Sequence, residues 1–235
     1  MLSINTNNIN KNIPKALQEL NKMGFDFCVC GGIICQFYLG KHARYTEDID
    51  IVTNLEVKDF EKMFKEHFHV ISFSYQPVSP VFFEETFSAR VEIDNEEIII
   101  EGMKINFYKD IVCKEYEING VPFKGTNIEF VVAEKFIALN NELDRLYKHF
   151  VELYSFSLLD ESVIDKKEVK RYVNLINEDE NVVRASFNKP EVKVVYKLRE
   201  DKKFFGPTVL PTLQAKHNVS KETMETSVND WLAKF

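Results

Sequence analysis

The segment from Phe25 to Thr53 limits most strongly what this chain can fold into. It opens with an apolar run that ends at Cys30, continues with Gly31-Gly32 and a stretch of helical spacing from Ile33 to Leu39, and closes on Asp48-Ile49-Asp50. A strand, a glycine turn, a helix and a second strand are expected in this order. This succession of elements is typical of α/β folds.

The same segment places phosphate-binding and metal-binding groups side by side. Two glycines at the start of a helix let backbone N–H groups approach a phosphate, and the helix dipole favours negative charge there. Side chains alternate along a strand, so Asp48 and Asp50 point the same way, with Cα atoms about 6 to 7 Å apart. Carboxylates at this spacing share Mg²⁺ ions that bridge triphosphate oxygens. We therefore expect Gly31 and Gly32 to bind a nucleoside triphosphate (NTP), and Asp48 and Asp50 to be catalytic Mg²⁺ ligands.

Elsewhere the patterns predict an α/β core at 1–130 and a mainly helical region at 131–235. Helices are expected at 12–23, 57–67, 133–156, 166–177 and 220–233, a strand at 70–75, and hairpins turning at Asp94-Asn95 and Asn119-Gly120. The predicted core is a mixed sheet flanked by helices, an α/β (α+β) class. The patterns at 184–198 and around Gly206-Pro207 are ambiguous, which leaves room for a short strand pair in the second region.

Composition excludes several classes of protein. The 235 residues are 45% apolar and 29% charged, which is typical of a folded chain and not of a disordered one. A net charge of −7 argues against a surface devoted to nucleic acid, because neutralising phosphates needs clustered Lys and Arg. A local basic groove stays open, and the run from Lys166 to Arg171 is one candidate for it.

Two further features concern the compartment. No apolar stretch approaches the roughly 18 residues that span a bilayer, and the N-terminus lacks the apolar core of a signal peptide. We therefore expect a cytoplasmic protein with no membrane partner. The four cysteines, Cys28, Cys30, Cys35 and Cys113, lack paired metal-ligand spacing and are expected to be reduced and buried.

The combination of Gly31-Gly32, a helix, and Arg44-x-Thr46-x-Asp48-Ile-Asp50 resembles the start of the AbiEii-type nucleotidyltransferases of bacterial toxin–antitoxin systems. The resemblance runs from about residue 13 to 157, and it includes Ala133-Glu134-Lys135 opening a helix. It implies a polymerase-β-like nucleotidyltransferase fold, nucleotide contacts from Arg44 and Thr46, and a catalytic, phosphate-contacting Lys135. A solvent-facing lysine in a first helical turn is the simpler alternative for Lys135.

Two positions depart from the family pattern. The third metal carboxylate of the superfamily best matches Asn106, whose amide oxygen can ligate Mg²⁺ but removes a negative charge and the base for an incoming hydroxyl. Glu92, Asp94 or Glu101 are alternative third ligands. Farther on, Lys148-His149 stands where the family has a basic residue followed by Asp, with Glu152 nearby. His149 is therefore a candidate for altered chemistry, and a structural role in the helix is the alternative.

Three hypotheses about function follow. The first is an Mg²⁺-dependent enzyme that transfers a nucleoside monophosphate from an NTP to a hydroxyl of RNA (such as tRNA), of a protein or of a small molecule, with a cognate antitoxin protein as partner. The second is a catalytically degenerate relative that binds nucleotide without turnover, which Asn106 and Lys148-His149 favour. The third is an interaction protein that binds no nucleotide.

Overall fold

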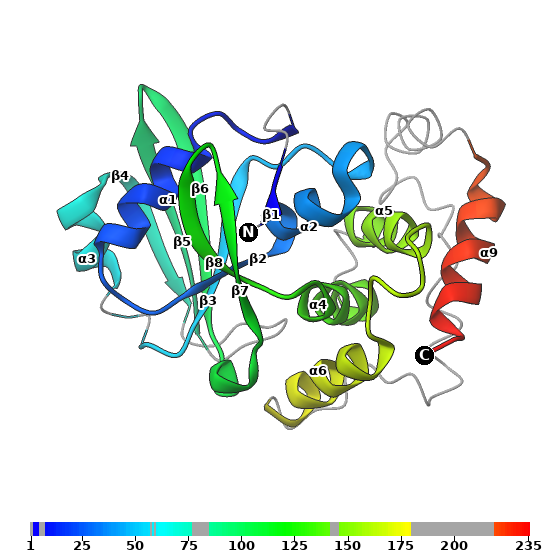
Figure 1. The fold of residues 1–235 in the computed structure, drawn as a ribbon. Coiled ribbons are helices and arrows are strands. Elements are labelled where there is room, and N and C mark those ends of the chain that lie inside the picture. The colour runs from blue at the N-terminus through cyan, green and yellow to red at the C-terminus, as the bar shows by residue number, and fades with distance from the viewer. Residues whose placement is uncertain are drawn as a thin grey trace. The chain divides into compact units, whose positions relative to one another are not determined.

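The computed structural model describes residues 2–4, 8–56, 58, 60–76, 85–141, 146–179 and 219–235. The chain divides into two compact units, Met1–Ile128 and Glu129–Phe235. The first unit is built on a sheet with helices against it, and the described elements of the second are helices (Figure 1). The predicted mixed α/β class is therefore confirmed.

One mixed sheet of eight strands organises the first unit, in the order β1-β7-β8-β2-β3-β6-β5-β4. β3 pairs with β6 in parallel and with β2 in antiparallel fashion, so it lies in the middle of the sheet. The strands are β1 (Leu2–Ser3), β2 (Cys28–Cys30), β3 (Asp48–Thr53), β4 (His69–Gln76), β5 (Glu85–Ile93), β6 (Glu96–Lys104), β7 (Cys113–Ile118) and β8 (Val121–Thr126).

The described residues of this unit form the α-helices α1 (Ile13–Lys22), α2 (Gly31–Leu39) and α3 (Phe60–His67), with 3₁₀ turns at Gly40–His42 and Tyr108–Asp110. α1 buries the apolar positions that the sequence places at helical spacing, and it ends before Gly24, whose φ is 73°. α3 and the sheet meet through an aromatic cluster in which the rings of Phe60 and Phe64 pack on Phe87 at 5.1 and 5.3 Å. These contacts form the core under β5.

Two tight turns set the register of the long strands. Asp94 and Asn95 both have positive φ, 54° and 61°, and they join β5 to β6; Asn119 and Gly120, at 50° and 78°, join β7 to β8. Positive φ at both central residues is the type I′ turn that two-residue hairpins prefer. Both hairpins predicted from the sequence are confirmed.

The expectation of four reduced, buried cysteines is wrong for two of them. Cys28 in β2 and Cys113 in β7 form a disulfide, with Cα atoms 6.5 Å apart, and Cys113 is exposed. β2 and β7 lie on either side of β8, so two cysteines that are 85 residues apart in sequence come close together in the sheet. Cys30 and Cys35 are buried thiols.

The second unit contains the described helices α4 (Ile128–Asn141), α5 (Leu146–Ser157), α6 (Lys166–Asp179) and α9 (Lys221–Leu232). The Ser220 side chain caps α9 by accepting a hydrogen bond from the Thr223 backbone N–H. The ambiguous patterns at 184–198 and 206–207 lie outside the described residues. Within the described part of the chain, no helix has the length and apolarity needed to cross a membrane.

Candidate active site

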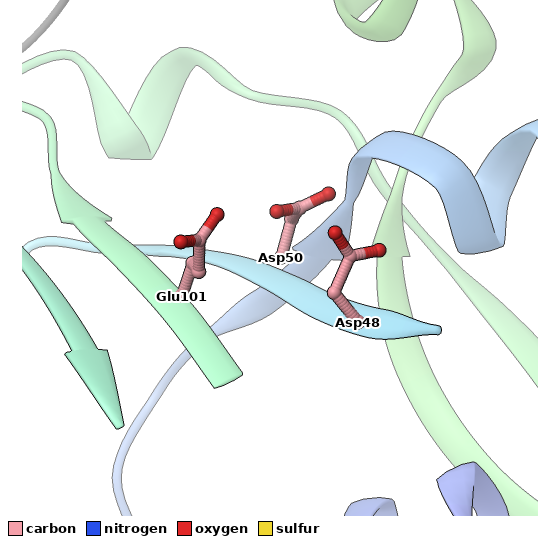
Figure 2. A group of neighbouring side chains, drawn as sticks. All are labelled: Asp48, Asp50 and Glu101. Carbon is pink, nitrogen blue, oxygen red and sulfur yellow. The ribbon is translucent and has the colours of Figure 1, made fainter. Parts of the chain in front are cut away.

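The two aspartates lie on the central strand, side by side on one face. Asp48 opens β3 and Asp50 follows two residues on, while Ile49 and Ile51 between and after them are buried without solvent exposure. The alternation of a strand explains this division, with the apolar side chains on the opposite face from the carboxylates. Figure 2 shows both carboxylates rising from β3 on the same side.

A third carboxylate comes from the neighbouring parallel strand. Residue partners across β3 and β6 are Asp48 with Ile99 and Asp50 with Glu101, so the Glu101 side chain stands beside that of Asp50 (Figure 2). One oxygen each of Asp48, Asp50 and Glu101 lies within 4.8 Å of the others. Three carboxylates thus converge on one point of the sheet.

The structure brings Glu101, and not Asn106, to the aspartates. β6 ends at Lys104, and Asn106 is an exposed residue in the turn that follows. By strand alternation Asn106 also has the parity of Gly102, whose face is packed against Ile51 and the Phe87 ring. A continued strand would therefore point Asn106 away from the carboxylates.

The other two acids considered from the sequence lie near the far end of the β5–β6 hairpin. Glu92 pairs with His69, at 3.5 Å between Oε1 and Nδ1, and Asp94 in the turn forms an ion pair with Lys15 of α1. Glu92 thus contacts β4, and Asp94 contacts α1. Glu101 is the one of the three proposed substitutes that joins the cluster.

The donor set fits a hard divalent cation. Oxygen ligands from several carboxylates are what Mg²⁺ and related ions bind. Asp48 Oδ1 supports this fit, because it is a buried oxygen with no hydrogen-bond partner among the described residues. Three carboxylates this close repel one another in the absence of a cation, so their arrangement is a poor source of stability. The residues that would hold the ion are Asp48, Asp50 and Glu101.

The glycine turn stands next to the carboxylates. Cys30 pairs with Asp50 across β2 and β3, so Gly31, the first residue of α2, begins the helix beside Asp50. Gly31 has φ 63°, and a Cβ added there would lie 2.9 Å from Asp50 Cγ. Position 31 therefore requires glycine for two reasons, its positive φ and the lack of space for a Cβ. Backbone N–H groups at the start of α2 are available to an anion near the carboxylates.

The loop before β3 is tied to α2 by one buried glutamine. Gln36 Nε2 donates to the Arg44 carbonyl at 2.6 Å and to Thr46 Oγ1 at 2.9 Å. Asn8 completes the network by donating its side-chain N–H to Gln36 Oε1 and to the Ala43 carbonyl. Gln36 and Asn8 are not among the residues predicted from the sequence, since neither belongs to a motif.

This network places Arg44 and Thr46 against the second glycine. A Cβ on Gly32 would lie 3.1 Å from Thr46 Oγ1 and 3.3 Å from Arg44 Nη2. The first unit therefore gathers all of the residues predicted there to bind nucleotide, Gly31, Gly32, Arg44 and Thr46, in one contiguous region. Their contact with a nucleotide stays a prediction.

Lys135 belongs to the second unit, in α4, and it is not a solvent-facing lysine. Its side chain is 4% exposed, and its Nζ lies 3.7 Å from Glu152 Oε2 of α5 and 3.8 Å from Glu134 Oε1. His149 is also buried in α5. Lys135, Glu134 and Glu152 form a buried cluster that links α4 and α5.

One comparison with a solved structure shows the class of fold. A solved candidate nucleotidyltransferase from H. pylori aligns over 95% of this chain and 93% of its own, with 10% identity and a TM-score of 0.55, which shows the fold. JHP933 from Helicobacter pylori aligns over 95% and 90%, with 11% identity and a TM-score of 0.49. An antigenic nucleotidyltransferase-like protein from Paracoccidioides brasiliensis aligns over 72% and 87%, with 15% identity and a TM-score of 0.43.

Sequence comparison identifies the family. No curated protein matches the chain. The family model described as nucleotidyl transferase of unknown function, DUF2204, matches residues 9–189, which is most of the sequence. This chain is therefore a member of the DUF2204 nucleotidyl transferase family.

Proposed function

We propose that the protein is an active nucleotidyltransferase that moves a nucleoside monophosphate from an NTP to a hydroxyl group, with Mg²⁺ as cofactor. The observation that carries this proposal is the convergence of Asp48, Asp50 and Glu101 beside the Gly31 helix start. A binding module that had lost catalysis would have no need for three carboxylates whose mutual repulsion costs stability.

Different groups of residues in the site have different roles in this reaction. The N–H groups at the start of α2 bind the triphosphate, and Arg44 adds positive charge near them. Asp48, Asp50 and Glu101 hold the divalent cation, which supplies neutralisation of the charge on the phosphates when it is bound. Lys135, on the strength of the AbiEii-type resemblance, is proposed as a further phosphate contact.

The transfer itself balances as a displacement at the α-phosphorus. The acceptor hydroxyl oxygen forms a bond to that phosphorus, the bond to the oxygen bridging the α- and β-phosphates breaks, and pyrophosphate leaves. The hydroxyl proton passes to a carboxylate, for which Glu101 is the proposed general base because it lies on the side of the cluster away from Gly31. The chain thus supplies both the phosphate cradle and the base.

The AbiEii-type resemblance also suggests a biological role and a class of partner. It favours a toxin with a cognate antitoxin protein as partner, and it leaves an RNA such as tRNA, a protein or a small molecule as acceptor. The test of the core proposal is titration of the four NTPs by calorimetry, with and without Mg²⁺, followed by incubation with α-³²P-labelled NTPs.

The outcomes separate the functions. Mg²⁺-dependent binding with transfer of the α-label to an acceptor supports the enzyme, and binding without transfer identifies a degenerate nucleotide-binding relative. The absence of NTP binding in both conditions identifies an interaction protein of another kind. Asp48→Asn combined with Asp50→Asn is the control, since it removes the ligands for the cation while keeping side-chain size.

A further inference from the structure

Beyond the cluster of carboxylates, a line of directly opposed residues crosses the sheet. Asp50 in β3 is the partner of Glu101 in β6, Glu101 is the partner of Ser88 in β5, and Ser88 is the partner of Ser74 in β4. Opposed residues in a sheet place their side chains on the same face. We call these four residues the central row.

The central row has a direction. Gly31 lies beside Asp50 at one end, through the pairing of β2 with β3, and Ser88 and Ser74 lie at the other, beyond Glu101. In phosphoryl transfer the attacking and leaving oxygens are roughly in line on opposite sides of the phosphorus. With the leaving pyrophosphate held near Gly31, the acceptor has to enter from the side of Ser88.

Ser88 is well placed to meet that acceptor. Counting from the type I′ turn, the pair Ile93 and Glu96 closes the hairpin with hydrogen bonds, and bonded and non-bonded pairs alternate from there. Ser88 and Glu101 form a non-hydrogen-bonded pair. In such pairs the Cα atoms are about 4.5 Å apart, and the side chains lie closer together than in hydrogen-bonded pairs. A hydroxyl bound by Ser88 is therefore next to the proposed base.

The charge of this face selects the class of acceptor. All residues of β4, β5 and β6 are described, and on the face that carries Glu101 these strands have a single basic residue of the Lys or Arg type, Arg90. Its Nη1 lies 3.6 Å from Glu97 Oε2. The same face carries the acids Glu92, Glu97 and Glu101 and neutral groups such as Thr86 and Ser88. Nucleic acids are held mainly through cations on their phosphates. This face presents hydroxyl groups and net negative charge instead.

From these observations we propose that Ser88 binds the acceptor, and that the acceptor is a small uncharged polyhydroxyl compound rather than a nucleic acid. The inference rests on the proposed function and names its acceptor class. Ser88 donates a hydrogen bond to the acceptor, and the other polar side chains of this face replace the water around the acceptor's remaining hydroxyl groups.

A polypeptide acceptor fits the geometry less well. The sheet offers a polypeptide the outer edge of β4, where an extended segment adds as a further strand. Strands lie about 4.8 Å apart, so such a segment is three strand spacings, about 14 Å, from β6. A serine or threonine side chain does not cover that distance to Glu101.

The test uses the full chain with Mg²⁺ and a mixture of the four α-³²P-labelled NTPs. Three reactions run in parallel, with neutral sugars and polyols (glucose, ribose, inositol and glycerol), with a pool of short RNAs, and with no added acceptor to detect labelling of the protein itself. NTP affinity is measured separately by calorimetry. The variants are Ser88→Ala, Ser88→Thr and, as a matched control, Ser72→Ala, an exposed serine of the same face on the edge strand β4.

We expect label on a sugar or polyol. Ser88→Ala is expected to raise the KM for that acceptor about 3- to 10-fold by removing one hydrogen bond, while Ser88→Thr stays within about twofold of the wild type. NTP affinity is unchanged in all variants, and Ser72→Ala behaves as the wild type. Labelling of RNA or of the protein in place of the polyols, or a Ser88→Ala variant with an unchanged KM, overturns the inference. A wild type that labels no acceptor in any of the three reactions, whether or not it binds NTP, instead refutes the proposed function itself.

Discussion

The Gly31 backbone lies directly against the Asp50 carboxylate, so that a side chain at position 31 and a carboxylate at position 50 exclude each other. Gly31 has φ 63°, and a Cβ there would lie 2.9 Å from Asp50 Cγ. The start of α2 and a proposed metal ligand are thus one packed unit. A side chain added at Gly31 is therefore expected to disturb the proposed metal site.

Gly31→Ala is therefore expected to weaken both stability and metal binding. A left-handed backbone costs a non-glycine residue about 1–2 kcal/mol, and overpacking against Asp50 adds about 1–3 kcal/mol. Gly120→Ala is the matched control, because Gly120 has φ 78° with open space around its Cβ position. Urea unfolding measures the two losses. Equal losses in both variants, with unchanged Mn²⁺ affinity in Gly31→Ala, contradict the packing of Gly31 on Asp50.

Glu101→Gln is expected to lower the affinity for Mn²⁺, used as a substitute for Mg²⁺, by at least about 10-fold, because it removes one of three charged ligands. The free energy of unfolding without metal should stay the same or rise slightly, since carboxylate repulsion is relieved. Asn106→Asp and Glu92→Gln are the controls, and calorimetric titration is the measurement. If Asn106→Asp binds Mn²⁺ more tightly than the wild type and Glu101→Gln binds it equally well, the third metal ligand is at position 106 and not at position 101.

The third ligand shows what sequence reasoning reaches and where it stops. The period of a strand is enough to place Asp48 and Asp50 on one face, and the Asp94-Asn95 pair is enough to place the hairpin turn. The partner of Asp50 on β6 depends on the parallel register between two strands that are distant in sequence. The apolar-polar-apolar pattern around Asn106 imitates a strand position, although β6 ends at Lys104. Local patterns carry no information on such a register.

The same limit applies to the cysteines. Cys28 and Cys113 carry no shared motif, and only the order of β2, β8 and β7 brings them together. The role of Gln36 likewise has no signal in the sequence, because the turn after α2 is what brings Arg44 and Thr46 to its side chain. In contrast, the glycine turn and both hairpins follow from residues that are adjacent in sequence.

Gln36→Ala is expected to destabilise the first unit by about 1–3 kcal/mol, because buried groups lose their hydrogen-bond partner. Gln36 is 4% exposed and donates to both Arg44 and Thr46. Freeing this loop should also weaken NTP binding, which calorimetry measures with the folded variant. Tyr45→Ala in the same loop is the control, since Tyr45 is 47% exposed. If Gln36→Ala binds NTP as tightly as the wild type, Gln36 does not position the Arg44 loop for nucleotide.

The Cys28–Cys113 disulfide is expected to stabilise the first unit by about 2–4 kcal/mol, chiefly by closing a long loop in the unfolded chain. Cys113→Ser should therefore lower the midpoint of urea unfolding, and a reducing agent should have the same effect on the wild type but none on the variant. Alkylation of the unfolded, unreduced protein followed by mass spectrometry should modify two of the four cysteines. Modification of all four means that the thiols are reduced.

Lys135→Met tests whether the buried lysine acts on nucleotide, on the helices or on both. Its Nζ lies within 4 Å of Glu152 and Glu134, and its side chain is 4% exposed, so its loss removes a buried cation that lies beside two carboxylates. Removing one partner of a buried pair costs about 3–5 kcal/mol, whereas replacing both by apolar residues is often neutral. Lys135→Met should therefore be strongly destabilised, and Lys135→Met combined with Glu152→Leu should recover most of the stability. The double variant is then the protein on which to measure NTP binding. A stable double variant with weakened NTP affinity supports the proposed phosphate contact, and a stable double variant that binds NTP like the wild type reduces Lys135 to a bridge between α4 and α5.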